Sequence, residues 1–196
     1  MSELFSIQLQ NRQQQGRDGV WLDLPTTTEQ VQAALRQIGI SSDNPQGLFI
    51  SGYFAEEEKR FAIPYNMVLA SNVDELNFLA SRLETLSAGE RAELNAALQA
   101  PQSELSSIGR ITDFPENVDY YVHLPEVHGP AQLGDYYLNR SGMVDMPEEW
   151  KGGIDTAQFG RYVAQQEQGV FTEYGYLVKS GDEWQKVYEG QPVPEE

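Results

Sequence analysis

The fold of this chain is decided by residues 19–39, which read GVWLDLPTTTEQVQAALRQIG. The alternating apolar residues before Pro25 predict a strand. Thr26 and Glu29 have the spacing of a capping box, in which a hydroxyl and a carboxylate bond the first backbone amides of a helix. Gly39 follows as the residue that ends the helix. The helix is expected to bury one face, made of Val31, Ala34, Leu35 and Ile38.

Strands on both sides of this stretch complete an N-terminal unit. Phe5, Ile7 and Leu9 alternate with polar residues, which predicts a strand, and residues 48–50 predict another. We therefore expect a small α+β unit over residues 1–60.

A helical pattern follows. Asn72 and Glu75 form a second capping signal, ahead of apolar residues at helical spacing. Another helix is predicted to begin near Ser87 and to stop before Pro101, because proline cannot continue a helix. The sequence predicts two antiparallel helices in a central unit, residues 61–108, with residues 103–109 as a connector.

The remaining residues, 109–196, predict a second α+β unit. A helix is expected after Asp155, with Ala157, Phe159, Tyr162 and Val163 on its apolar face and Gly169 at its end. Strands are predicted at residues 135–138, 170–171, 175–178 and 184–188, with the last two joined across residues 180–183. The expected fold class is α+β, an elongated chain of three small units with an acidic surface.

Charge is the most informative property of the composition. Thirty acidic residues against thirteen Lys and Arg give a formal net charge of −17 in 196 residues. Residues 1–112 hold 14 acids and 8 bases, a net −6, and residues 113–196 hold 16 acids and 5 bases, a net −11. Such a chain repels nucleic acid, so its many C-terminal aromatic residues are better explained by packing than by base stacking.

Strong acidity has three common explanations. Disorder fits poorly with 11% aromatic residues. Adaptation to high salt would explain the charge without a partner, whereas a surface built for a basic partner would explain it with one. The composition leaves the last two open.

The sequence contains no recognisable motif for catalysis or metal binding. The chain has no cysteine, and its two histidines, His123 and His128, lack the i, i+4 spacing of a helical metal pair. Acidic runs such as residues 56–58 lack the spacing of a calcium loop, and no serine lies in a hydrolase elbow. We expect no enzyme activity, no cofactor and no metal.

The N-terminus has neither a basic segment nor a continuous apolar one, and no run of about 18 apolar residues occurs. The expected location is the cytoplasm, without membrane contact.

Four blocks in order resemble the ArdA antirestriction family. They are residues 19–25 with the following helix to Gly39, residues 74–80, the acidic run from Pro147 to Arg161, and residues 171–176. The resemblance implies a three-part elongated protein without catalysis, dimeric through its C-terminal part, whose carboxylates stand in for DNA phosphates. It also implies a type I restriction-modification enzyme, through its methyltransferase core, as the partner, and a mobile genetic element such as a conjugative transposon as the source.

The family region that matches residues 145–161 is its antirestriction motif. In this chain it is interrupted by residues 151–153, and Phe159 stands where many relatives have tyrosine. The resemblance makes the C-terminal acids candidates for a distributed partner-binding surface: Glu116, Asp119, Glu126, Asp135, Asp145, Glu148, Glu149, Asp155, Glu167, Glu173, Asp182 and Glu183.

Two further hypotheses remain. The chain could be an acidic adaptor for another basic protein, such as a nucleoid protein, or an enzyme with carboxylate chemistry. The second is disfavoured because the sequence places no acid beside a recognisable partner group.

Overall fold

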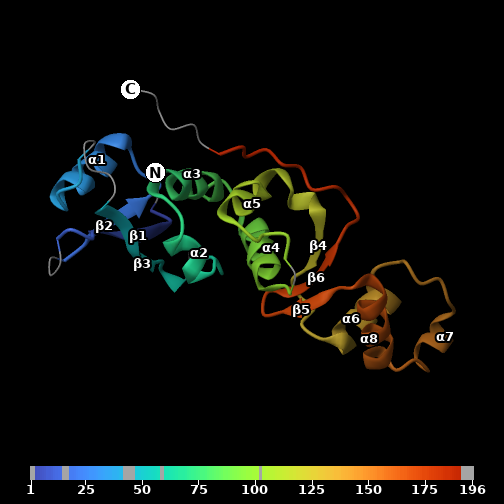
Figure 1. Ribbon diagram of the computed structural model, residues 1–196. Coiled ribbons are helices and arrows are strands. Elements are labelled where there is room, and N and C mark those ends of the chain that lie inside the picture. The colour runs from blue at the N-terminus through green and yellow to red at the C-terminus, as the bar shows by residue number, and fades with distance from the viewer. Residues whose placement is uncertain (1–2, 15–17, 42–46, 58–59, 102, 191–196) are drawn as a thin grey trace. The chain divides into compact units, whose positions relative to one another are not determined.

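The computed structural model describes residues 3–14, 18–41, 47–57, 60–101 and 103–190 (Figure 1). Its contacts form two compact units that interleave in sequence. Unit 1 comprises Met1–Ser87, Leu105–Glu116 and Lys186–Glu196, and unit 2 comprises Ala88–Glu104 and Asn117–Gln185. The three-part division at residues 60 and 108 stays a prediction, and the fold class is mixed α+β, as expected.

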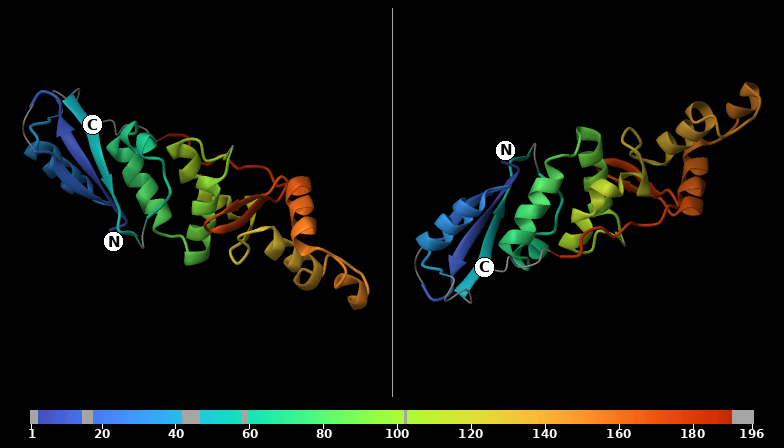
Figure 2. Two further views of the ribbon diagram at one scale, coloured as in Figure 1. Left: turned by 90° about the horizontal axis from the view of Figure 1, so that it is seen from below. Right: turned by 90° about the horizontal axis from the view of Figure 1, so that it is seen from above.

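Unit 1 is built on an antiparallel sheet of order β2-β1-β3 (Figure 2). Its strands, β1 (Phe5–Asn11), β2 (Val20–Leu24) and β3 (Leu48–Phe54), confirm the sequence prediction. Ile7, Leu9 and Leu24 point from one face into the core and are fully buried. The register shifts between Gln8 and Leu9, where β3 carries one extra residue.

Helices complete this unit: α1 (Thr28–Gln37), α2 (Tyr65–Leu69), α3 (Val73–Leu83) and α5 (Ile108–Thr112), with the 3-10 turn η3 (Phe114–Glu116). The predicted start of α3 is confirmed, because the Asn72 side chain accepts a hydrogen bond from the Glu75 amide at 2.8 Å. The end of α1 is confirmed as well. Gly39 has φ +69°, and the Ile40 amide bonds back to Leu35.

Two predictions in this unit were wrong in detail. The capping box of α1 is Thr27 with Gln30, one residue after the predicted pair. Thr26 is held instead by Asn77 of α3, whose side chain bonds its amide at 2.7 Å and its carbonyl at 3.0 Å. The last two residues of the predicted connector, residues 103–109, begin the helix α5, whose Ile108 and Ile111 are buried.

Unit 2 contains an antiparallel sheet of order β4-β6-β5. Its strands are β4 (Tyr121–Leu124), β5 (Val170–Thr172) and β6 (Gly175–Lys179). The helical segments are α4 (Ala88–Gln99), η4 (Val118–Tyr120), α6 (Pro130–Asp135), η5 (Tyr136–Arg140), α7 (Glu148–Lys151) and α8 (Thr156–Glu167). Because α3 and α4 belong to different units, their antiparallel pairing stays a prediction.

The predicted strand at residues 135–138 was wrong. These residues end α6 and begin the π-helical segment η5. Pro130 occupies the first turn of α6, and Leu133 and Leu138 are buried at helical positions. The tyrosines have high strand propensity, but packing against α8 decides the local structure here.

The helix after Asp155 is confirmed, because Asp155 caps α8 by accepting from the Gln158 amide at 2.9 Å. Its buried face differs from the prediction. Gly160 and Ala164 are buried, whereas Tyr162 is 60% exposed. The helix ends at Glu167, and Gln168, not Gly169, adopts the left-handed conformation at φ +56°.

The predicted strand at residues 184–188 and its hairpin were also wrong, since this segment has no regular structure. It is held by side chains instead of a strand neighbour. Asn117 bonds Gln185 in both directions at 2.7 and 2.9 Å. Asp113 accepts from the amides of Val187 and Tyr188.

Candidate partner-binding surface

Both compact units are strongly anionic. Unit 2 holds 14 acids and 5 bases, a net −9, and unit 1 holds 16 acids and 8 bases, a net −8. The net charges of the two compact units therefore differ by one, whereas those of residues 1–112 and 113–196 differ by five. A net negative charge of this size on each unit would attract a basic partner.

Ten of the twelve candidate acids are exposed at the surface. They lie on short helices, helix ends, turns and loops. They are Glu116, Asp119, Glu126, Asp145, Glu148, Glu149, Asp155, Glu173, Asp182 and Glu183.

Glu167 has a structural role, although the sequence made it a candidate for partner binding. One oxygen accepts from the Tyr137 hydroxyl at 2.6 Å and the other accepts from the Tyr176 hydroxyl at 2.9 Å. Tyr176 is fully buried. The pKa of each tyrosine is held above its ordinary value, mainly by burial and secondly by the hydrogen bond to Glu167. Both carboxylate oxygens are thus engaged inside unit 2.

Asp135 is half-buried at the end of α6. It accepts from Asn139 at 2.9 Å and forms an ion pair with Arg140 at 3.3 Å. This local network leaves Asp135 less available to a partner than the fully exposed acids.

Some exposed candidates have neighbours of their own. Glu148 pairs with Lys151 at 2.7 Å, and Glu116 pairs with Arg82. Exposed ion pairs of this kind contribute only about 0–1 kcal/mol. A basic partner can replace them at small cost.

Several candidates are near one another in sequence on the segment before α8. Glu148 and Glu149 lie side by side on α7, and Asp145 and Asp155 flank this helix in the chain. Trp150, on the same short helix, is 65% exposed. The remaining candidates are spread over other elements, so the structure offers a distributed surface and not one cluster.

The sequence did not single out Glu93, on the inner side of α4. Burial, together with the charges of Glu90 and Asp119, raises the pKa of Glu93 to about 8. Its Oε1 atom is buried and accepts no hydrogen bond from the described residues. The helical spacing between Glu93 and the buried Ala96 and Ala97 is a signal that could have indicated this position.

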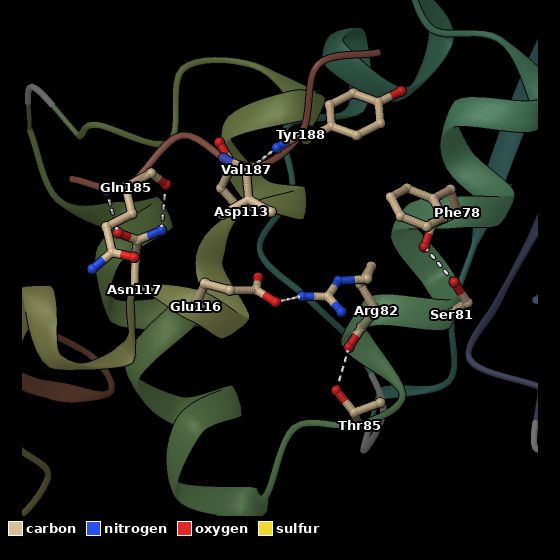
Figure 3. Close-up of polar contacts among 10 residues, drawn as sticks. All are labelled: Phe78, Ser81, Arg82, Thr85, Asp113, Glu116, Asn117, Gln185, Val187 and Tyr188. Atoms are coloured by element: carbon tan, nitrogen blue, oxygen red, sulfur yellow. Dashed lines mark hydrogen bonds and ion pairs between the residues drawn. The ribbon is translucent and has the colours of Figure 1, made fainter. Parts of the chain in front are cut away.

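Unit 1 contains a cavity of about 430 Å³ between α3, η3 and the C-terminal segment (Figure 3). Phe78 and Tyr188 stack across it with ring centroids 5.6 Å apart. Its polar side chains serve the fold, since Asp113 holds the segment at residues 187–188 and Arg82 pairs with Glu116. The arrangement closes unit 1 and sets up no reacting pair.

One of the two histidines contacts a backbone carbonyl. His123 lies with Nε2 2.7 Å from the Tyr174 carbonyl oxygen. Within the described ranges, no group of three or more His, Cys, Asp or Glu side chains is arranged to hold a metal ion. In the same residues, no helix combines the length and apolar character needed to cross a membrane.

Comparison with known proteins agrees with the resemblance found in the sequence. No curated protein matches the chain. The model of one family, described as antirestriction protein (ArdA), matches residues 15–178. That match covers most of both compact units, including α7, α8 and the strands β2 and β3 of unit 1. The chain therefore belongs to the ArdA antirestriction protein family, whose members are non-enzymatic inhibitors.

Proposed function

We propose that this chain inhibits type I restriction-modification enzymes by occupying their DNA-binding groove as a mimic of duplex charge. The observation that carries the proposal is the spread of exposed carboxylates over unit 2, on elements that leave them uncovered. The family match supports an antirestriction role. The geometry supports the mechanism, because a groove that binds phosphates along a duplex needs many separated anions.

The amount of charge suits this role. Duplex DNA carries one negative charge per about 1.7 Å of axis, so the net charge of −17 corresponds to about 30 Å of duplex. Carboxylates that meet Lys and Arg in a groove release counterions much as phosphates do. They offer neither a base to methylate nor a phosphodiester to cut, so occupancy alone inhibits.

A homodimer formed through the C-terminal part is a second element of the proposal. Two-fold pairing would join two anionic surfaces and double the length of duplex that is imitated. Apolar contacts would have to separate the acids, since two surfaces of like charge repel. Sedimentation of the full chain at several salt concentrations measures this association.

The direct test is an inhibition assay with a purified type I enzyme. The chain should block DNA cleavage, and added duplex that carries the recognition site should restore it. Loss of duplex binding by the isolated methyltransferase core should follow the same titration. Full cleavage at saturating chain would overturn the proposal, and a tighter complex with another basic protein would favour the adaptor hypothesis.

A further inference from the structure

The indole of Trp21 lies across the outer face of the unit 1 sheet. Trp21 on β2 and Gly52 on β3 both pair with Gln8 on the central strand β1. A Cβ built on Gly52 would lie 3.0 Å from Cη2 of Trp21 and 3.1 Å from Cβ of Gln8. The ring therefore extends from one edge strand over the central strand to the other. Glycine at position 52 leaves the room that the ring occupies.

This ring is also accessible. Trp21 is 50% exposed, and Phe54 on the same face is 54% exposed. A flat indole that rests on a sheet and keeps half of its surface in solvent presents a ready-made stacking platform. Its position is fixed by strand pairing, so little side-chain freedom is lost when a second group stacks on it.

Carboxylates lie close to the platform. Asp23 follows Trp21 by two residues on the same face of β2 and is exposed. The Ser6 hydroxyl lies 2.8 Å from Oδ1 of Asp23 and 3.3 Å from Oε1 of Glu3. The carboxylates of Asp23 and Glu3 thus converge on the Ser6 hydroxyl, on the face that carries the Trp21 ring. A cation placed there would meet both the carboxylates and the ring.

The same face already carries one such pairing within the chain. The Arg12 guanidinium lies 5.2 Å from the centre of the Phe49 ring. Phe49 pairs with Gln10, which stands on the same side of β1 as Gln8. This sheet therefore accommodates a guanidinium over an aromatic side chain.

We infer that Trp21, with Asp23 and Glu3, is a docking platform for an arginine side chain of the basic partner. The inference rests on the proposed function for the identity of that partner. A guanidinium stacks its plane on an indole and directs its N–H groups sideways to carboxylates, whereas an ammonium cannot do both in one plane. A nucleobase is disfavoured by the surrounding negative charge. The platform adds selectivity for arginine to an attraction that charge alone would give equally to lysine.

A peptide experiment tests the platform without any restriction enzyme. Hexa-arginine and hexa-lysine of equal charge are titrated into the full chain, and the indole N–H signals of its tryptophans are followed by NMR. Hexa-arginine should shift the Trp21 signal and bind more tightly than hexa-lysine. Trp21→Leu should remove this preference and weaken hexa-arginine binding about 3- to 30-fold, the range expected for a cation over an indole.

Matched variants separate the platform from general exposure. Tyr162→Leu removes an exposed aromatic ring on α8, away from the platform, and should keep the preference for arginine. Gly52→Ala keeps every acid and aromatic residue but crowds the edge of the Trp21 ring, so it should change the preference less than Trp21→Leu does. Equal binding of both peptides by the wild-type chain, or an unchanged preference in Trp21→Leu with its fold intact, would overturn the inference.

The restriction enzyme distinguishes this inference from the proposed function. Trp21→Leu should weaken binding to the methyltransferase core by the same factor and still inhibit at higher concentration. If the wild-type chain inhibits and Trp21→Leu binds equally well, the platform is wrong and the mimicry stands. If the wild-type chain does not bind the core, the proposed function fails, whatever the peptides show.

Discussion

At the scale of single residues, this acidic chain departs from a simple charged surface at two half-buried carboxylates, Glu93 and Glu167. Glu93 has a pKa of about 8, against an ordinary value of 4.5, because burial and two neighbouring acids disfavour its anion. Glu167 uses both oxygens to accept from the hydroxyls of Tyr137 and Tyr176. Neither position follows from charge counting, because each depends on residues brought near by the fold.

The raised pKa of Glu93 predicts a fall in stability with rising pH. Between about pH 4.5 and 8 the unfolded chain releases the Glu93 proton while the folded chain keeps it, so unfolding becomes easier. Glu93→Gln should reduce this decline and raise the midpoint of thermal unfolding at pH 8 more than at pH 5. Glu126→Gln, at an exposed acid, is the control and should change neither. The same pH profile in Glu93→Gln and wild type would contradict the assignment.

The role of Glu167 predicts a loss of stability without a matching loss of inhibition. Glu167→Ala leaves the hydroxyls of Tyr137 and Tyr176 without their acceptor, which should cost about 1–3 kcal/mol in free energy of unfolding. Glu167→Gln keeps one acceptor oxygen and should cost less. Urea denaturation measures both. An unchanged free energy of unfolding in Glu167→Ala would show that these two hydrogen bonds do not stabilise the fold.

At the scale of elements, the close contact of α6 with α8 organises the helical part of unit 2. A Cβ on Gly134 would overlap the Thr156 carbonyl oxygen, and one on Gly160 would overlap that of Pro130. Only glycine allows the two backbones this approach. Gly160 belongs to the acidic block through which the sequence resembles the family, so this block has a packing role as well as a charged surface.

Gly160→Ala should therefore destabilise the chain by about 1–3 kcal/mol, as overpacking of a close contact does. Gly89→Ala is the matched control on α4, where a Cβ would meet nothing within 4 Å. That change should be neutral or should stabilise by up to about 1 kcal/mol, because alanine favours helix. Thermal unfolding of both variants measures these changes in stability. Equal stability of Gly160→Ala and Gly89→Ala would contradict the close contact of α6 with α8.

The elements that the sequence predicted correctly carry local signals. Asn72 and Asp155 cap their helices, and Gly39 ends α1 as expected. The errors arose where a distant residue decides the structure. Residues 135–138 turn helical because Gly134 packs on α8, and residues 184–188 are held by Asn117 and Asp113. Periodicity cannot reveal partners so far away in sequence.

The candidate surface, like the fold, could be predicted only in part from the sequence. Exposure of the acids around α7 followed from composition, because carboxylates in short polar segments stay in solvent. The engagement of Glu167 by two tyrosines did not follow, since Tyr137 and Tyr176 reach it from other elements.

At the scale of the whole molecule, the negative charge is spread so widely that no single acid should be essential. Glu148→Gln should weaken binding to the methyltransferase core by no more than about five-fold, the share of an exposed pair. Arg161→Gln removes an exposed cation and should strengthen binding slightly. Calorimetric titration of each variant measures these changes. Abolished binding in Glu148→Gln, with the fold intact, would require a localised site.

The central claim is that this chain replaces DNA through charge, and the salt dependence of its binding tests it most directly. The affinity for the isolated methyltransferase core should be measured from 50 to 200 mM salt, with a duplex site as competitor. Mimicry of six or more phosphates predicts a weakening of about 10³-fold or more over this range, and mutually exclusive binding with the duplex. An affinity that does not change with salt, or a complex that holds duplex and chain together, would contradict the account.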